Sequence, residues 1–135
     1  MEHIISAIKW AAAAVGSVAG LLLGKADGLL FALLAFMAID YLTGILVACR
    51  EKTLSSEVGF AGLAKKVLML LLVVVGNVLD VQVLGGGAIM RSAVIAFYLA
   101  NEGLSILENA GSLGVPYPEA LRAVLAQLRD KEDER

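Results

Sequence analysis

Apolar residues dominate four long segments of the chain, and short polar or glycine-rich stretches separate them. The segments cover about residues 4–24, 28–49, 64–84 and 88–109. Each is close to the ~20 apolar residues that a helix needs to cross a bilayer. The pattern therefore predicts an all-α protein with four transmembrane helices. A three-span arrangement, with one end segment lying at the membrane surface, is the competing interpretation, because the fourth segment carries several polar residues.

The last part of the chain follows a different pattern. Two glycines and two prolines interrupt it between Gly111 and Pro118, and Pro118 followed by Glu119 is typical of a helix N-terminus. Apolar residues then recur at the spacing of an amphipathic helix, at Leu121, Val124, Leu125 and Leu128. We therefore predict a transmembrane domain over 1–110, and a cytoplasmic linker, short amphipathic helix and charged tail over 111–135.

Composition supports a membrane protein. The hydrophobic fraction of 59% and the mean hydropathy of +0.83 exceed those of ordinary soluble domains. A net charge of −2 gives no reason to expect a nucleic-acid partner. Four spans would place nine of the 11 Lys and Arg residues on one side and leave Lys25 and Arg91 on the other. The positive-inside rule then predicts that both termini are cytoplasmic. The cytoplasmic basic loop would hold Arg50, Lys52, Lys65 and Lys66.

Small residues predict where helices associate. In the first segment they recur every four residues, at Ala12, Gly16, Gly20 and Gly24, which places them on one helix face. Such a face lets another helix backbone approach closely, although glycines are also simply common in membrane helices. In the second segment, Asp40 lies on the same face as Gly44 and other small residues. We expect that face to meet protein and not lipid.

Polar residues inside the apolar segments are the candidate functional residues. A carboxylate in lipid is unfavourable and marks a functional site by default. Counted from the outer ends of their segments, Asp40 lies at ~18 Å and Asn101 at ~20 Å along the helix rise, so the two share one layer of the bilayer. Residues for helix association or pore lining are therefore Gly16, Gly20, Gly24, Asp40, Thr43, Gly44, Asn77, Asn101, Glu102 and Ser105. A polar clamp between helices, with no permeation, is the alternative.

No arrangement of residues indicates catalysis. His3 is the lone histidine, and Cys49 is the lone cysteine. Asp80 lies near the far end of its segment, where we expect it to be solvated at the interface. The glycines at 85–87 form a turn without the Lys-Ser/Thr pair of a phosphate-binding loop. We therefore expect no enzymatic activity, no cofactor and no metal.

Two motifs carry a resemblance to a known family. The first is Asp40-Tyr41-Leu42-Thr43-Gly44, followed by serines, glycines and a Lys-Lys pair that lead into an apolar span. The second is the run 97–109 before the charged tail helix. Together, over about residues 30–130, they resemble the phage holin family that includes the clostridial toxin-secretion holins. The resemblance implies an integral, self-associating protein of the bacterial cytoplasmic membrane that permeabilises this membrane, releases an endolysin or toxin and promotes lysis.

The resemblance assigns no residue a catalytic role, and two other functions stay open. One is a small ion or solute channel or transporter that uses the layer around Asp40. The other is a non-permeating membrane scaffold or antiholin, whose 118–135 region recruits a cytoplasmic partner. The sequence therefore predicts three classes of membrane function, with a homo-oligomeric holin-type pore former first.

Overall fold

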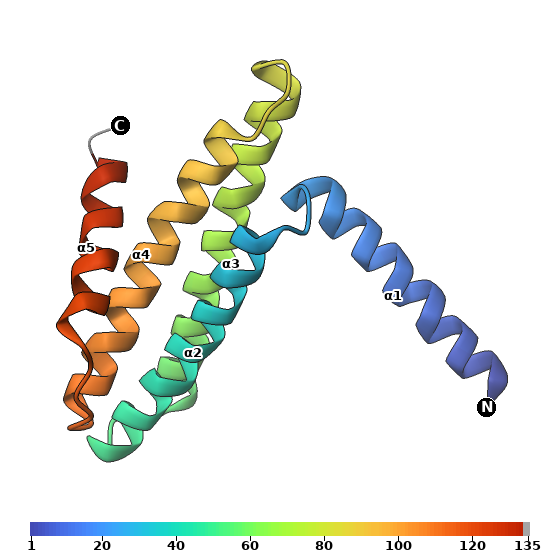
Figure 1. The fold of residues 1–135 in the computed structure, drawn as a ribbon. Helices are drawn as coiled ribbons and strands as arrows, with labels where there is room; N and C mark the ends of the chain where they lie inside the picture. Colours follow the sequence, from blue (N-terminus) through green and yellow to red (C-terminus); the bar gives the residue numbers. More distant parts are fainter. Residues whose placement is uncertain (134–135) are drawn as a thin grey trace.

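The computed structural model describes residues 1–133, and within that range the chain is helical with no strand. The final residues of the predicted tail, 134–135, lie outside the described part. The elements are α1 (Glu2–Leu23), α2 (Gly28–Arg50), α3 (Ser56–Val78), the π-helical segment η1 (Leu79–Val83), α4 (Ile89–Ser112) and α5 (Glu119–Asp133) (Figure 1). The all-α prediction is confirmed for the described residues.

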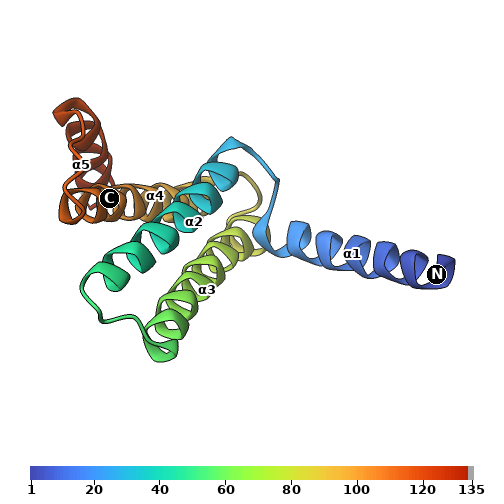
Figure 2. The same ribbon diagram turned by 90° about the horizontal axis from the view of Figure 1, so that it is seen from below.

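Helices α2, α3 and α4 form an up-and-down bundle, and α5 turns back along the outer side of α4 (Figures 1 and 2). Apolar side chains from all three bundle helices meet in one core, which contains Leu30, Leu33, Met37, Val73 and Ile95. Leu33, Val73 and Ile95 have no exposed surface. The core thus fixes α2, α3 and α4 as one body.

Helix α1 leaves this bundle at its C-terminal end and points away from it (Figures 1 and 2). None of the residues Glu2–Leu23 is buried. A Cβ atom added at Gly16 or at Gly20 would have no other side chain or helix within 4 Å. The predicted small-residue face of α1 therefore has no partner at Gly16 and Gly20 within the described part of the chain, whereas Gly24, at its end, lies against the bundle.

Three helical stretches within residues 1–133 are long and apolar enough to cross a membrane: Glu2–Leu23, Gly28–Arg50 and Ser56–Val83. Helix α4 is not among them, because Arg91, Asn101 and Glu102 lower its hydropathy. A fourth crossing by α4 therefore stays a prediction, as does the cytoplasmic placement of α5.

The connection between α2 and α3 is shorter than the sequence indicated. Ser55 begins α3, because its side chain accepts a hydrogen bond from the Val58 amide at 3.1 Å. Gly59 and Gly62 do not interrupt the helix; the Tyr41 ring packs against both. Lys65 and Lys66 consequently lie inside α3 and not in the basic loop, where only Arg50 and Lys52 of the four expected cations lie at or beside the turn.

Candidate functional site

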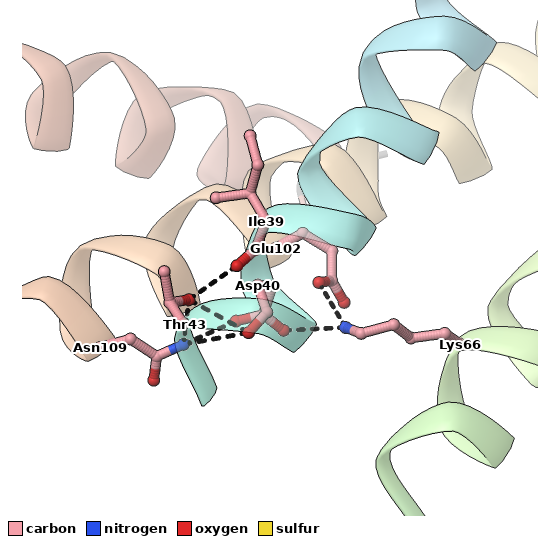
Figure 3. A network of polar contacts seen from close by, with 6 residues as sticks. All are labelled: Ile39, Asp40, Thr43, Lys66, Glu102 and Asn109. Atoms are coloured by element: carbon pink, nitrogen blue, oxygen red, sulfur yellow. Dashed lines mark hydrogen bonds and ion pairs between the residues drawn. The ribbon is translucent and has the colours of Figure 1, made fainter. Parts of the chain in front are cut away.

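A buried ion network joins the three bundle helices (Figure 3). The Lys66 ammonium of α3 donates to Asp40 Oδ2 of α2 and to Glu102 Oε2 of α4, each at 2.8 Å. The side chains of Lys66, Asp40 and Glu102 are 12%, 15% and 4% exposed. Removing charges from water is costly unless each charge has close partners. The network supplies those partners, so it requires all three helices to be in register.

The three charged residues lie in one layer of the bundle. Asp40 is ten residues from Arg50, Lys66 is ten from Ser56, and Glu102 is ten from Ser112. At ~1.5 Å per residue, each is ~15 Å from the same end of the bundle. Since the helices have 23 or 24 residues, this layer lies near their middle. The charges therefore meet far from either polar end.

Asn109 and Thr43 extend the hydrogen bonding around Asp40. The Asn109 amide donates to Asp40 Oδ1 at 3.0 Å and to Thr43 Oγ1 at 2.9 Å. The Thr43 hydroxyl donates back to the Ile39 carbonyl at 2.8 Å (Figure 3). Both carboxylate oxygens of Asp40 are thus occupied. Among the described residues, no fully buried side-chain nitrogen or oxygen lacks a hydrogen-bond partner.

A cavity of about 420 Å³ lies beside the network between α2, α3 and α4. The network residues form one wall, and Tyr41, Lys65 and Met69 are among the side chains on the others. Within residues 1–133, no group of three or more His, Cys, Asp or Glu side chains could hold a metal ion. The cavity is therefore lined by ion-paired and hydrogen-bonding groups without a metal-binding set.

A second polar cluster ties the end of α1 to the opposite end of the bundle. Arg91 of α4, which is 2% exposed, donates to the Leu23 carbonyl at 2.6 Å and the Lys25 carbonyl at 2.5 Å, and pairs with Asp27 at 2.8 Å. Asn77 of α3 donates to the Leu22 carbonyl at 2.9 Å. Two side chains therefore satisfy carbonyls that a helix end leaves free.

Asp27 is the N-cap residue of α2 and forms an ion pair with Arg91. Its carboxylate pairs with Arg91 and also accepts the Leu30 amide at 3.0 Å, which caps the helix. The Arg91 guanidinium, followed by the Leu30 amide, holds the pKa of the Asp27 carboxyl below its usual value. Asp27 thus stays ionised where α1, α2 and α4 meet.

The expectation for Asp80 is wrong. Asp80 is 1% exposed, and its two carboxylate oxygens accept the Met90 and Arg91 amides at 2.9 Å each. It therefore satisfies amides at the start of α4 and is not solvated at the interface. The turn through the glycines 85–87, all with positive φ, folds the start of α4 back onto η1 and covers Asp80.

The structure brings together some of the residues singled out in the sequence. Asp40, Thr43 and Glu102 meet in the network, and Gly44, Asn101 and Ser105 line its cavity. Asn77 instead holds the end of α1, and Gly24 lies against Asn77 and Arg91. Gly16 and Gly20 join neither cluster.

The sequence did not predict that four residues belong to these clusters: Lys66, which was expected in the basic loop, and Asn109, Arg91 and Asp27. A signal for Lys66 was present, because Met69, Val73 and Asn77 follow it at helical spacing and form the inward face of α3. Extending that face back from Met69 places Lys66 on it. Asn109 and Arg91 carried no comparable local signal.

Comparison with known proteins identifies the family of this helical chain. Residues 17–130 match the model of the bacteriophage holin family. The chain belongs to the bacteriophage holin family. The match includes all three helices of the ion network and leaves most of α1 outside. With its three apolar helices, this holin-family chain is a membrane protein.

Relatives of this holin-family chain occur in bacteria and in a phage. It is 42% identical to "Uncharacterized 14.9 kDa protein in nagH 3'region" of Clostridium perfringens, over 98% of this chain and 100% of the relative. It is 39% identical to "Uncharacterized protein Lmo0128" of Listeria monocytogenes, over 94% and 90%. It is 33% identical to "Probable holin" of Bacillus phage phi105, over 76% of each chain. No solved structure matches it.

Proposed function

We propose that this protein is a non-enzymatic, holin-type pore former of the bacterial cytoplasmic membrane. Copies of the chain associate, permeabilise the membrane and so release an endolysin or a toxin. The observation that carries the proposal is α1: in a member of the holin family, a helix long enough to span the bilayer has no buried residue among Glu2–Leu23. Its apolar faces and small-residue stripe are free to meet other copies.

The packing of the bundle supports an opening between copies and not within one. Leu33, Val73 and Ile95 fill the space between α2, α3 and α4. The cavity beside the network is only about 420 Å³. A protein-sized passage therefore needs several chains, and closed rings of identical subunits are the usual way to build one.

The ion network supports a clamping role for Asp40. Both of its oxygens have partners, and Lys66 also satisfies Glu102. Such a network holds α2, α3 and α4 together as a unit that can assemble. The polar cavity is the observation that favours a second candidate, a small-solute channel. Flux of one defined solute that Asp40→Asn abolishes, in a membrane otherwise tight, would support the channel.

The orientation proposed for the chain has the N-terminus, the α2–α3 turn and the α4–α5 turn on the cytoplasmic side. In the bundle, the α2–α3 turn and the α4–α5 turn lie at one end, where the Arg50 guanidinium donates to the Ser112 carbonyl at 2.6 Å. Because α4 runs beside α2 and α3 over this length, we propose that it crosses the membrane together with those two helices (Figure 1). Labelling of Ser112→Cys in a Cys49→Ala background from each side of the membrane tests the number of crossings.

The proposed function is tested by regulated expression in bacteria, with membrane potential and growth followed over time. Expression should halt growth and dissipate the potential, and Gly16→Leu with Gly20→Leu should delay both. A Cβ atom at either position has nothing within 4 Å, so the fold of one copy should tolerate the substitutions. The matched control is Ala7→Leu with Ala11→Leu, two exposed positions on the opposite face of α1. Undisturbed potential at confirmed membrane expression would reject pore formation.

A further inference from the structure

Helix α5 lies against α4 at the depth of the ion network. The Leu125 side chain of α5 is 8% exposed and packs on the Gly103 backbone of α4. A Cβ atom added at Gly103 would lie only 2.8 Å and 2.9 Å from the two methyl groups of Leu125. Gly103 follows Glu102, the network residue of α4. The middle of α5 is therefore level with the layer of Asp40, Lys66 and Glu102, near the middle of the bundle.

The charged residues of α5 lie beyond that layer. Arg129, Asp130 and Lys131 follow Leu125 by four to six residues, which places them ~6–9 Å further along the helix axis. Because α5 runs antiparallel to α4, this direction leads away from the turn at 113–118 (Figure 1). The side chains of Arg129 and Asp130 are 45% and 70% exposed. These charges thus stand on the outer surface of the bundle, past its midpoint.

The other faces of the bundle have the opposite character. Large apolar side chains are exposed along α2 and α3, for example Phe31, Leu42, Phe60 and Leu68. Within α4, which is described in full, the exposed large apolar side chains are Ile89 and Met90 at its start. The α2–α3 side of the bundle is therefore suited to lipid, whereas α5 exposes charged side chains together with two large apolar ones, Leu121 and Val124. Exposed charges at this depth are unfavourable in hydrocarbon and are found facing protein or a water-filled space.

We propose that the outer face of α5 lines the aqueous side of the assembled membrane lesion, with α5 remaining docked on α4. This inference rests on the proposed function and names the surface that meets water in it. The wet surface is then α5 and not the Asp40 layer, whose charged groups are already paired with one another. Ala123 and Gln127 lie at the centre of the outer face, and both are exposed.

The test uses single cysteines in a Cys49→Ala background and a membrane-impermeant thiol reagent, applied to cells in which the membrane potential has collapsed. The labelling rates of Ala123→Cys and Gln127→Cys should lie within about tenfold of the rate of Glu2→Cys. The labelling rates of Leu125→Cys and of the lipid-side control Leu42→Cys should be at least about a hundredfold lower, because a thiol in apolar surroundings stays protonated and unreactive. If Leu125→Cys reacts as fast as Gln127→Cys, α5 has left the bundle and the inference is wrong.

A second variant separates a docked α5 from one that must be released. Gly103→Cys with Leu125→Cys places two thiols where Leu125 of α5 packs on the Gly103 backbone of α4, and oxidation should join them. The oxidised protein should dissipate the membrane potential with the same onset as its reduced form. Loss of leakage on oxidation, restored by a reductant, would overturn the inference but leave the proposed function standing. Absence of leakage from every variant, with or without oxidant, would overturn both.

Discussion

Helices α1 and α2 have nearly the same length, 22 and 23 residues, and both are apolar enough to cross a bilayer. Helix α2 is held by Asp40, whose charge needs Lys66 and Asn109. Helix α1 carries no buried side chain between Glu2 and Leu23. Lipid tails are as apolar as leucine, so hydrophobicity inserts a helix without selecting its neighbours. Helix α2 therefore has a packed apolar face and a polar network that fix its neighbours, whereas most of α1 has neither.

Glycines in the bundle and in α1 show the same difference. Gly76 of α3 lets the backbone of α4 approach, and a Cβ there would lie 3.1 Å from the Arg91 backbone. At Gly16 of α1, a Cβ would meet nothing within 4 Å. Close packing has therefore been reached in the bundle, while the glycine face of α1 remains available to another molecule.

The largest effect is expected from Lys66→Met. Removing the ammonium leaves Asp40 and Glu102 as buried, unpaired charges, which typically costs about 3–5 kcal/mol. The free energy of unfolding in detergent micelles, followed by circular dichroism, measures this loss. If the charges alone are responsible, adding Asp40→Asn and Glu102→Gln to Lys66→Met should recover most of it.

Lys65→Met is the matched control for this prediction. Lys65 is the neighbouring lysine in α3 but is exposed and makes no ion pair among the described residues. Its removal should change the free energy of unfolding by no more than about 0.5 kcal/mol. Equal losses for Lys65→Met and Lys66→Met would show that the network does not hold the bundle.

An intermediate effect is expected from Gly76→Ala. The added methyl group presses on the backbone of Met90 and Arg91 and should cost about 1–3 kcal/mol, as overpacking does. Gly16→Ala should cost nothing and could gain up to about 1 kcal/mol, because alanine favours a helix. Thermal unfolding in micelles compares the two. A loss at Gly16 as large as that at Gly76 would mean that α1 is packed within the single chain.

The smallest effect is expected from Asp27→Asn, which keeps an N-cap but removes the charge that pairs with Arg91. The loss at pH 7 should be about 1 kcal/mol, because Asp27 is partly exposed. Since the folded pKa of Asp27 lies below the ordinary 3.8, its contribution is present above that pH and disappears as the pH falls through the folded value.

Unfolding of the wild type and of Asp27→Asn, measured in micelles between pH 2 and pH 7, checks this dependence. The two proteins should differ at neutral pH and converge in acid. A difference that persists unchanged at the lowest pH would assign the effect to the cap of α2 and not to the pair with Arg91.

Much of the fold could be predicted from sequence because it depends on local patterns. Hydropathy located the helices, and the Pro118-Glu119 start located α5. Counting helix rises placed Asp40 and Asn101 in one layer, and the structure pairs Asp40 and the next residue, Glu102, with Lys66. The prediction failed at Lys66 itself, because its position in a polar stretch indicated a loop, while the cap at Ser55 had already begun the helix.

The sequence by itself determined that this chain enters a membrane as helices and belongs to the bacteriophage holin family. Hydropathy and helix periodicity are properties of neighbouring residues, so they can be obtained without a fold. Only the tertiary structure decided that Lys66 pairs with both Asp40 and Glu102, that Arg91 holds the end of α1, and that α5 returns along α4. Those pairings depend on the rotation and register of whole helices, which no local pattern specifies.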